Sequence, residues 1–96
     1  MAEHYREIRH AFVDRFNNDE EVQVGFRFRR PSAEAVERCQ AKVGKKPSLA
    51  YRSLCIHCVQ AEDKQAMLEA FDAYPGLPTS FGNALLEAAG FADLGN

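Results

Sequence analysis

Three cysteines and one histidine are the residues best suited to chemistry in this sequence: Cys39, Cys55, His57 and Cys58. Four soft ligands of this kind are what a structural zinc site needs, and two neighbouring thiols can form a redox pair. Residues 55–58 are predicted to be helical, and on a helix His57 points about 100° away from Cys58 and roughly 200° from Cys55. We therefore predict that the cysteines pack in the core, as free cysteine on an apolar helix face ordinarily does. A metal site and a redox thiol pair are the alternatives.

No other group of residues forms a catalytic arrangement in the sequence. The histidines and hydroxyl residues lack the spacing of a base with its nucleophile, and the glycines are too scattered for a phosphate-binding loop. Arg27, Arg29 and Arg30 lack aromatic residues on their own strand face, so a nucleic-acid site is not favoured. We expect a protein that is not an enzyme and that uses no metal, cofactor or nucleic acid.

The composition is that of an ordinary soluble globular chain. With 96 residues, 46% of them hydrophobic, the chain is expected to form one domain over residues 1–96 with a small core. No apolar run approaches the ~20 residues that cross a bilayer, and the charged start lacks the apolar segment of a secretory signal. The odd number of cysteines favours a reducing cytoplasm. Lys and Arg dominate residues 1–52, whereas Asp and Glu dominate residues 53–96, and this asymmetry can orient a partner.

Residues 21–30 carry the one clear strand pattern. Val22, Val24, Phe26 and Phe28 alternate with polar residues or glycine, which is typical of a half-buried strand, and Pro31 ends the pattern. A lone strand, or a short hairpin near these residues, leaves backbone groups unpaired. We therefore predict that a second copy of the chain or another protein pairs with it.

The rest of the chain reads as helical, so the predicted fold is mainly α, with about four to five helices. Residues 3–17 place apolar side chains at helical spacing, and the polar run 17–19 then ends that helix. A helical region follows over residues 32–90. Helices are expected to start at Ser32, at Ser48, at Glu62 with Asp63, and at Thr79 or Ser80. The last helix is expected to end at Gly90 in a left-handed conformation.

Two segments together resemble a known family. The first segment is Phe26-Arg27-Phe28-Arg29-Arg30-Pro31-Ser32. The second segment begins with Tyr74-Pro75-Gly76-Leu77-Pro78 and continues with residues 82–87 and 88–91. Between the two segments, a helix ends in the dipeptide Val59-Gln60, shortly before Glu62. This arrangement is similar to the small tail assembly chaperones of long-tailed bacteriophages and prophages. The resemblance covers roughly residues 20–91.

That resemblance implies a small, mostly helical protein of the bacterial host cytoplasm that binds the tape measure protein. Such a chaperone keeps its client soluble until tail tube subunits polymerise around it, acts without ATP, and is expected to be a homo-oligomer. The expected partner-binding residues are Val22, Val24, Phe26, Arg27, Phe28, Arg29, Leu68, Leu77 and Leu86. The alternatives are a non-catalytic helical adaptor for protein–protein interaction and a small Cys/His metal-binding protein.

Overall fold

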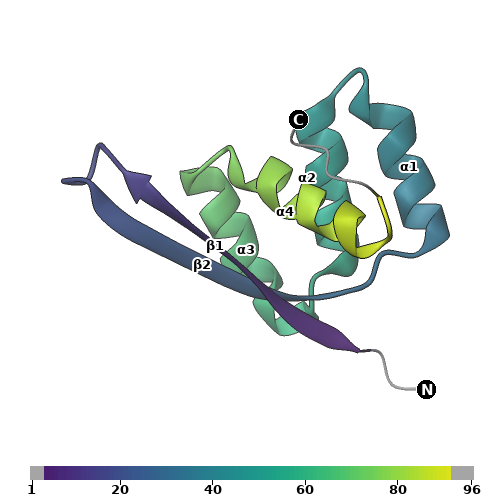
Figure 1. Ribbon diagram of the computed structural model, residues 1–96, viewed down its shortest axis with the longest axis horizontal. Coiled ribbons are helices and arrows are strands. Elements are labelled where there is room, and N and C mark those ends of the chain that lie inside the picture. Colours follow the sequence, from purple (N-terminus) through teal and green to yellow (C-terminus); the bar gives the residue numbers. More distant parts are fainter. Residues whose placement is uncertain (1–3, 92–96) are drawn as a thin grey trace.

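The computed structural model describes residues 4–91 as a two-stranded antiparallel hairpin followed by four helices. In chain order the elements are β1 (Tyr5–Asp14), β2 (Glu20–Arg29), α1 (Ala33–Val43), α2 (Pro47–Cys58), α3 (Ala61–Ala73) and α4 (Leu77–Ala88). The hairpin lies along one side of the helices, and its turn extends beyond them (Figure 1). The fold is therefore α+β, and the expectation of a mainly helical protein is wrong.

The main correction concerns residues 5–14, which form β1 and not part of a helix over residues 3–17. Ile8 and Phe12 are four positions apart, a spacing that shares one face of a helix and equally one face of a strand. In the structure these two residues lie opposite Phe26 and Val22 of β2. The strand is favoured because it pairs the backbone of β2, which a helix at this position would leave without hydrogen-bonding partners.

The turn of the hairpin explains the polar residues interpreted above as the end of a helix. The N–H of Asn17 donates to the Asp14 carbonyl, and the N–H of Glu20 donates to the Asn17 carbonyl, both at 3.1 Å. Asn18 and Asp19 have φ values of 58° and 55°. Asn and Asp enter this left-handed region more readily than other non-glycine residues. The run 17–19 therefore reverses the chain between two strands.

Strand β2 occupies Glu20–Arg29, where a strand over residues 21–30 was predicted, and the four helices lie within residues 32–90, some of them with starts other than those expected. Ser32 caps α1, because its Oγ accepts a hydrogen bond of 3.1 Å from the N–H of Ala35. Helix α2 starts at Pro47 and not after Ser48, since the fixed φ of proline suits the first position of a helix.

Of the last two helices, α3 starts as predicted and α4 starts earlier than predicted. Glu62 and Asp63 lie in the first turn of α3, as predicted from the helix dipole. Helix α4 starts at Leu77 with Pro78 in its first turn, three or four residues before the start implied by a cap at Thr79 or Ser80. Gly90 follows α4 with a φ of 105°, which confirms the predicted left-handed position.

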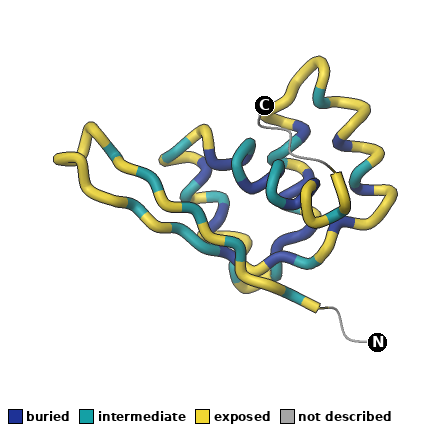
Figure 2. Tube along the Cα trace, viewed as in Figure 1, coloured by how far each residue is buried: buried dark blue, intermediate teal, exposed yellow. Residues whose placement is uncertain are grey.

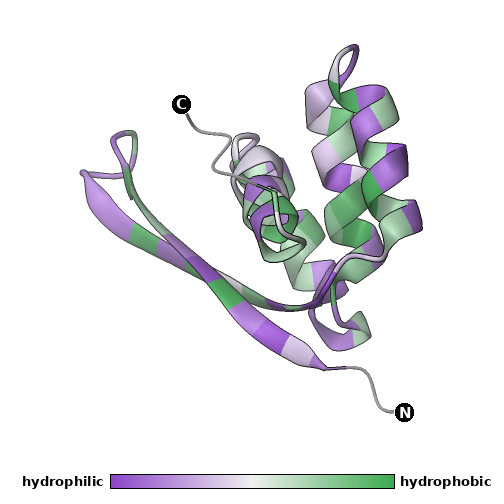
Figure 3. Ribbon diagram, turned by 45° about the vertical axis from the view of Figure 1, so that its right-hand side comes forward, coloured by the Kyte–Doolittle hydropathy of each residue, from purple (hydrophilic) through white to green (hydrophobic). Residues whose placement is uncertain are grey.

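The core lies between the helices and the inner face of the hairpin, where buried segments gather (Figure 2). Phe81 of α4 is at its centre, with ring-centroid distances of 5.5 Å to Phe26, 5.6 Å to Phe28 and 6.2 Å to Phe71. Hydrophilic and hydrophobic residues are mixed along both strands (Figure 3). The strand residues that pack in or against the core are Ile8, Phe12, Val24, Phe26 and Phe28. Within residues 4–91, no helix is long and apolar enough to cross a membrane.

Candidate protein-binding surface

The apolar row of β2, predicted to bind a partner, faces the core of its own chain. Phe26 and Phe28 are buried against Phe81, and Val22 and Val24 are half-buried on the same face. The backbone of β2 pairs with β1 from Arg29 to Glu20. The premise of an unpaired strand is therefore wrong, and these four side chains serve the fold of the chain itself.

Arg27, predicted to be a charge at the rim of a binding site, fastens the hairpin to the helices. Its guanidinium donates two hydrogen bonds to the Asp63 carboxylate, Nη2 to Oδ1 at 2.8 Å and Nε to Oδ2 at 3.0 Å. Its backbone N–H donates to Asp63 Oδ2 at 2.8 Å, and its carbonyl accepts from the N–H of Gln60 at 2.8 Å. These hydrogen bonds lower the pKa of Asp63 to about 2 and raise the pKa of Arg27. We call Arg27 and Asp63 the β2–α3 clamp.

Arg29 makes a second connection of this kind. Its Nη2 donates to the backbone carbonyl of His57 at 3.0 Å, in the last turn of α2. A cation at the C-terminal end of a helix satisfies a carbonyl that has no partner within the helix, and it also interacts favourably with the helix dipole. Both predicted rim charges therefore hold β2 in place.

The three leucines predicted on the last two helices are also mostly internal. Leu77 and Leu86 of α4 are 5% and 1% exposed and belong to the core, whereas Leu68 of α3 is half-buried beside it. Leu77 and Leu86 are therefore absent from the surface that the described residues present. Substitution of either one would affect packing before it affected binding.

The cysteines are buried, as predicted. Cys39, Cys55 and Cys58 are free thiols, and burial raises the pKa of Cys39 and of Cys55, so the reactive thiolate form is disfavoured. The thiol of Cys55 lies 3.9 Å from the carbonyl oxygen of Pro78, across the α2–α4 contact. In the described part of the chain, no group of three or more His, Cys, Asp or Glu side chains is placed to hold a metal ion.

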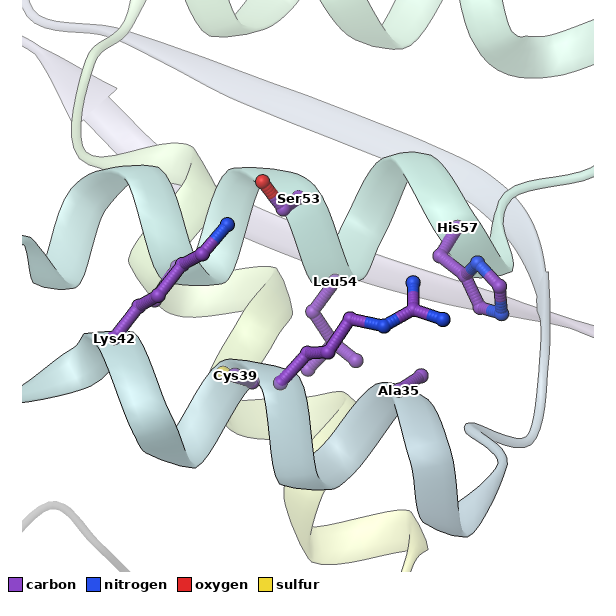
Figure 4. Close-up of a pocket in the computed structure, with 8 residues that line it drawn as sticks. Ala35, Cys39, Lys42, Ser53, Leu54 and His57 are labelled. Carbon is purple, nitrogen blue, oxygen red and sulfur yellow. The ribbon is translucent and has the colours of Figure 1, made fainter.

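A groove of about 200 Å³ lies between α1 and α2. Figure 4 shows Lys42 extending from α1 toward Ser53 of α2, with His57 at the other end of the groove and Leu54 between the helices. Arg38 also lines this groove and pairs with Glu34 of its own helix. The polar side chains in the groove are exposed, so the arrangement is that of a solvated basic surface.

The end of the hairpin presents the most exposed large apolar side chain among residues 4–91. Phe16 has a relative exposure of 103%, and Val13 is half exposed on the neighbouring strand end. The backbone at this end is fixed, because the Phe16 N–H donates to Asp14 Oδ1 at 3.0 Å and the Tyr74 hydroxyl donates to Asp14 Oδ2 at 3.0 Å. A pocket of about 280 Å³ lies here between residues 12–16 and Tyr74. We call Val13, Phe16 and this pocket the hairpin-end surface.

The hairpin-end surface was not predicted, because Phe16 is one of the apolar residues at helical spacing in the helix expected over residues 3–17. The available signal was the polar run 17–19, which fits a hairpin turn as well as a helix end. If residues 17–19 are a turn, Phe16 sits in the loop between strands and points into solvent. The exposed position of this aromatic residue therefore depends on recognising β1.

Comparison with known proteins identifies the family of the chain. A family model described as a domain of unknown function (DUF6848) matches residues 3–96, so the chain belongs to this family. Among solved structures, the uncharacterised protein rbstp2171 from Bacillus stearothermophilus has the same fold, with a TM-score of 0.73 and 22% sequence identity. The similarity covers 95% of this chain and 88% of that one. No curated protein matches the chain.

Proposed function

We propose that this member of the DUF6848 family is a tail assembly chaperone of a long-tailed bacteriophage or prophage. It binds the tape measure protein in the cytoplasm of the bacterial host and supports tail tube assembly. It acts as a homo-oligomer and uses no metal or nucleotide. The hairpin-end surface carries this proposal, and the resemblance in residues 20–91 supplies the class of client.

The segments that carry the resemblance contribute to the core and to the contacts between elements of this chain. The first contributes two core phenylalanines and the arginine of the β2–α3 clamp, and the second forms the turn between α3 and α4. These segments therefore favour a shared fold. Their large apolar side chains are mostly buried, so we seek the contact surface at the more exposed Phe16.

The hairpin-end surface has the chemistry that a helical client requires. Burying one phenylalanine side chain contributes about 1.5–3 kcal/mol, and the folded chain leaves that free energy unused at Phe16. The apolar stripe of an amphipathic helix is the usual partner of such a surface. Charged residues of both signs, Arg15, Asp19 and Glu20, surround Phe16 and are exposed, which suits the polar rim of a reversible interface.

Co-expression with the tape measure protein of the same gene cluster tests the proposal. We compare the wild type with Phe16→Ser and with Leu49→Ser, a matched control that removes an exposed apolar residue from α2. The wild type and the control are expected to keep the client soluble and to co-purify with it. Phe16→Ser should weaken the affinity about tenfold or more, because the lost burial corresponds to more than 1.4 kcal/mol.

Two results contradict different parts of the proposal. If Phe16→Ser binds the client as well as the wild type, the hairpin-end surface is not the contact. If the wild type neither solubilises nor binds the tape measure protein, the chaperone function is wrong. In that case a non-catalytic adaptor with another protein partner takes its place.

A further inference from the structure

The outer edge of β1 has unpaired backbone groups within residues 4–91, because the sheet described there contains only β1 and β2. The orientation of this edge follows from Arg27. Its N–H and carbonyl point away from β1, toward Asp63 and Gln60. Inward and outward groups alternate in an antiparallel ladder, so Glu7, which lies opposite Arg27, also directs its backbone groups outward. The outward groups of β1 therefore belong to residues 5, 7, 9, 11 and 13.

This edge carries charged side chains at Arg6, Glu7 and Arg9 but lacks the other features that usually prevent pairing between strands. β1 is ten residues long and contains no proline or glycine, and its ladder with β2 runs from Tyr5 to Asp14 without a bulge. Natural edge strands are commonly shortened, interrupted by proline or a bulge, or covered by another element. The opposite edge illustrates such cover, because the α2–α3 junction occupies β2 at Arg27 and Phe28.

We propose that a second copy of the chain pairs with this edge, β1 against β1 in antiparallel orientation, with the twofold axis at Ile8. This inference specifies the self-association included in the proposed function and rests on it. The two hairpins then form one four-stranded sheet in the order β2, β1, β1, β2. Residues 5–11 of each copy pair with residues 11–5 of the other.

The charges of β1 select this register. The two β1 strands can form backbone hydrogen bonds only where odd-numbered residues of one copy lie opposite odd-numbered residues of the other. In every such register the twofold axis passes through a residue and not between two residues. An axis at Glu7 or at Arg9 would place two like charges directly opposite each other, which is destabilising. Within one chain, Arg9 Nε already donates to Glu7 Oε1 at 2.9 Å on the exposed face of the sheet. An axis at Ile8 places Glu7 opposite Arg9 twice, so the two intrachain pairs join into a cluster of four charges that alternate in sign. The edge is therefore complementary in charge to itself.

The register with its axis at His10 gives neither Glu7 nor Arg9 an oppositely charged partner in the second copy. It places Glu7 opposite Val13 and Arg9 opposite Ala11. It also sets Arg6 opposite Asp14, whose carboxylate already accepts hydrogen bonds from Tyr74 and from the backbone of Phe16.

A hollow beside the proposed axis supports the same site. It has a volume of about 350 Å³ and is lined on the helix side of the sheet by Ile8, Phe28, Leu85 and Ala88, together with arginine side chains. Phe28 and Leu85 are buried at the base of this hollow, whereas Ile8 is only partly buried and has side-chain surface left for contact with a second copy. The Ile8-centred pair brings the second copy to this position.

Sedimentation velocity of the purified chain, without any client, tests this interface separately from chaperone function. The wild type is expected to be a dimer at micromolar concentration. Glu7→Arg or Arg9→Glu alone places like charges opposite each other and should weaken the dimer about tenfold. The double variant Glu7→Arg/Arg9→Glu restores opposite charges and should restore the dimer. Glu21→Arg, on the same face of β2 but away from the edge, is the matched control.

Cross-linking then tests the register. Residues at the twofold axis form a pair without backbone hydrogen bonds, with Cα atoms about 4.5 Å apart, a distance within the range of a disulfide. Under mild oxidation, Ile8→Cys should form a disulfide-linked dimer and His10→Cys should not. Circular dichroism confirms that each variant is folded. A monomeric wild type, or single charge variants that dimerise as well as the wild type, would overturn the interface. Dimers linked through position 10 and not position 8 would overturn the register.

Discussion

Replacing Asp63 with asparagine tests the β2–α3 clamp, which fixes the hairpin on the helices. Asparagine keeps the size of the side chain and an acceptor oxygen but removes the charge that Arg27 neutralises. The Arg27 hydrogen bonds lower the pKa of Asp63 from an ordinary 3.8 to about 2. This difference corresponds to roughly 2.5 kcal/mol before solvent screening.

Solvent screening makes the free energy of the Arg27–Asp63 interaction smaller than this value, because the Arg27 side chain is 47% exposed and the Asp63 side chain is 20% exposed. We therefore expect Asp63→Asn to lower the free energy of unfolding by about 1–1.5 kcal/mol at neutral pH. Since the pKa is lower in the folded state, the contribution is complete above about pH 4.5 and is lost as the pH falls toward 2.

Urea unfolding of the wild type and of Asp63→Asn, measured at intervals from pH 7 to pH 2, checks this prediction. The difference between the two free energies should shrink across the acidic part of the range. Asp72→Asn is the matched control, because Asp72 is exposed and lies 3.8 Å from Arg52, and we expect it to change stability little. A difference between wild type and Asp63→Asn that stays constant down to pH 2, or that is no larger than that of the control, would refute the clamp.

Two further predictions concern the packing of the helices. Gly82→Ala should destabilise the protein by about 1–3 kcal/mol, because the new Cβ would lie 2.5 Å from Cδ1 of Tyr51, whereas Gly44→Ala, which meets nothing within 4 Å, should be nearly neutral in thermal melts. Cys55→Ala should cost about 1–2 kcal/mol through lost packing, and the wild-type thiols should react with a disulfide reagent only after unfolding. Rapid labelling of the native protein, or a melting curve shifted by a chelator, would contradict the structural role of the cysteines.

The helical part of the fold could be predicted because its signals are local. Ser32 accepts the hydrogen bond expected of a cap, Gly90 adopts the expected left-handed φ, and the cysteines lie on buried faces. Each of these outcomes depends on residues within one or two turns of the chain. The helix starts at Pro47 and Leu77 were missed because a proline in the first turn competes with nearby serine and threonine as a start signal.

Only the second strand of the hairpin could be predicted from the sequence, because the pairing of two strands depends on residues that are distant along the chain. The spacing of Ile8 and Phe12 satisfies a helix and a strand equally. The choice between them depends on their partners in β2, Phe26 and Val22, which are ten or more residues away along the chain. The error then affected the candidate site. A β2 without a partner made its apolar row resemble a binding surface, and a helical Phe16 made the exposed aromatic residue resemble core.

The clamp was missed for a related reason. Arg27 alternates with core residues along β2, so its side chain was assigned to an exposed, partner-binding face. Its partner, Asp63, is 36 residues further along the chain and was explained by the dipole of α3 alone. Only the packing of α3 against β2 brings these two charges together, and no spacing in the sequence indicates that contact.

Site-specific photo-crosslinking tests most directly the central claim that the hairpin-end surface binds the client. A photoreactive amino acid is placed at position 16 or, as the matched control, at position 49, and the complex with the tape measure protein is irradiated. We expect a covalent adduct with the client from position 16 and none from position 49. A complex that forms normally but crosslinks only from position 49, or from neither position, would contradict it.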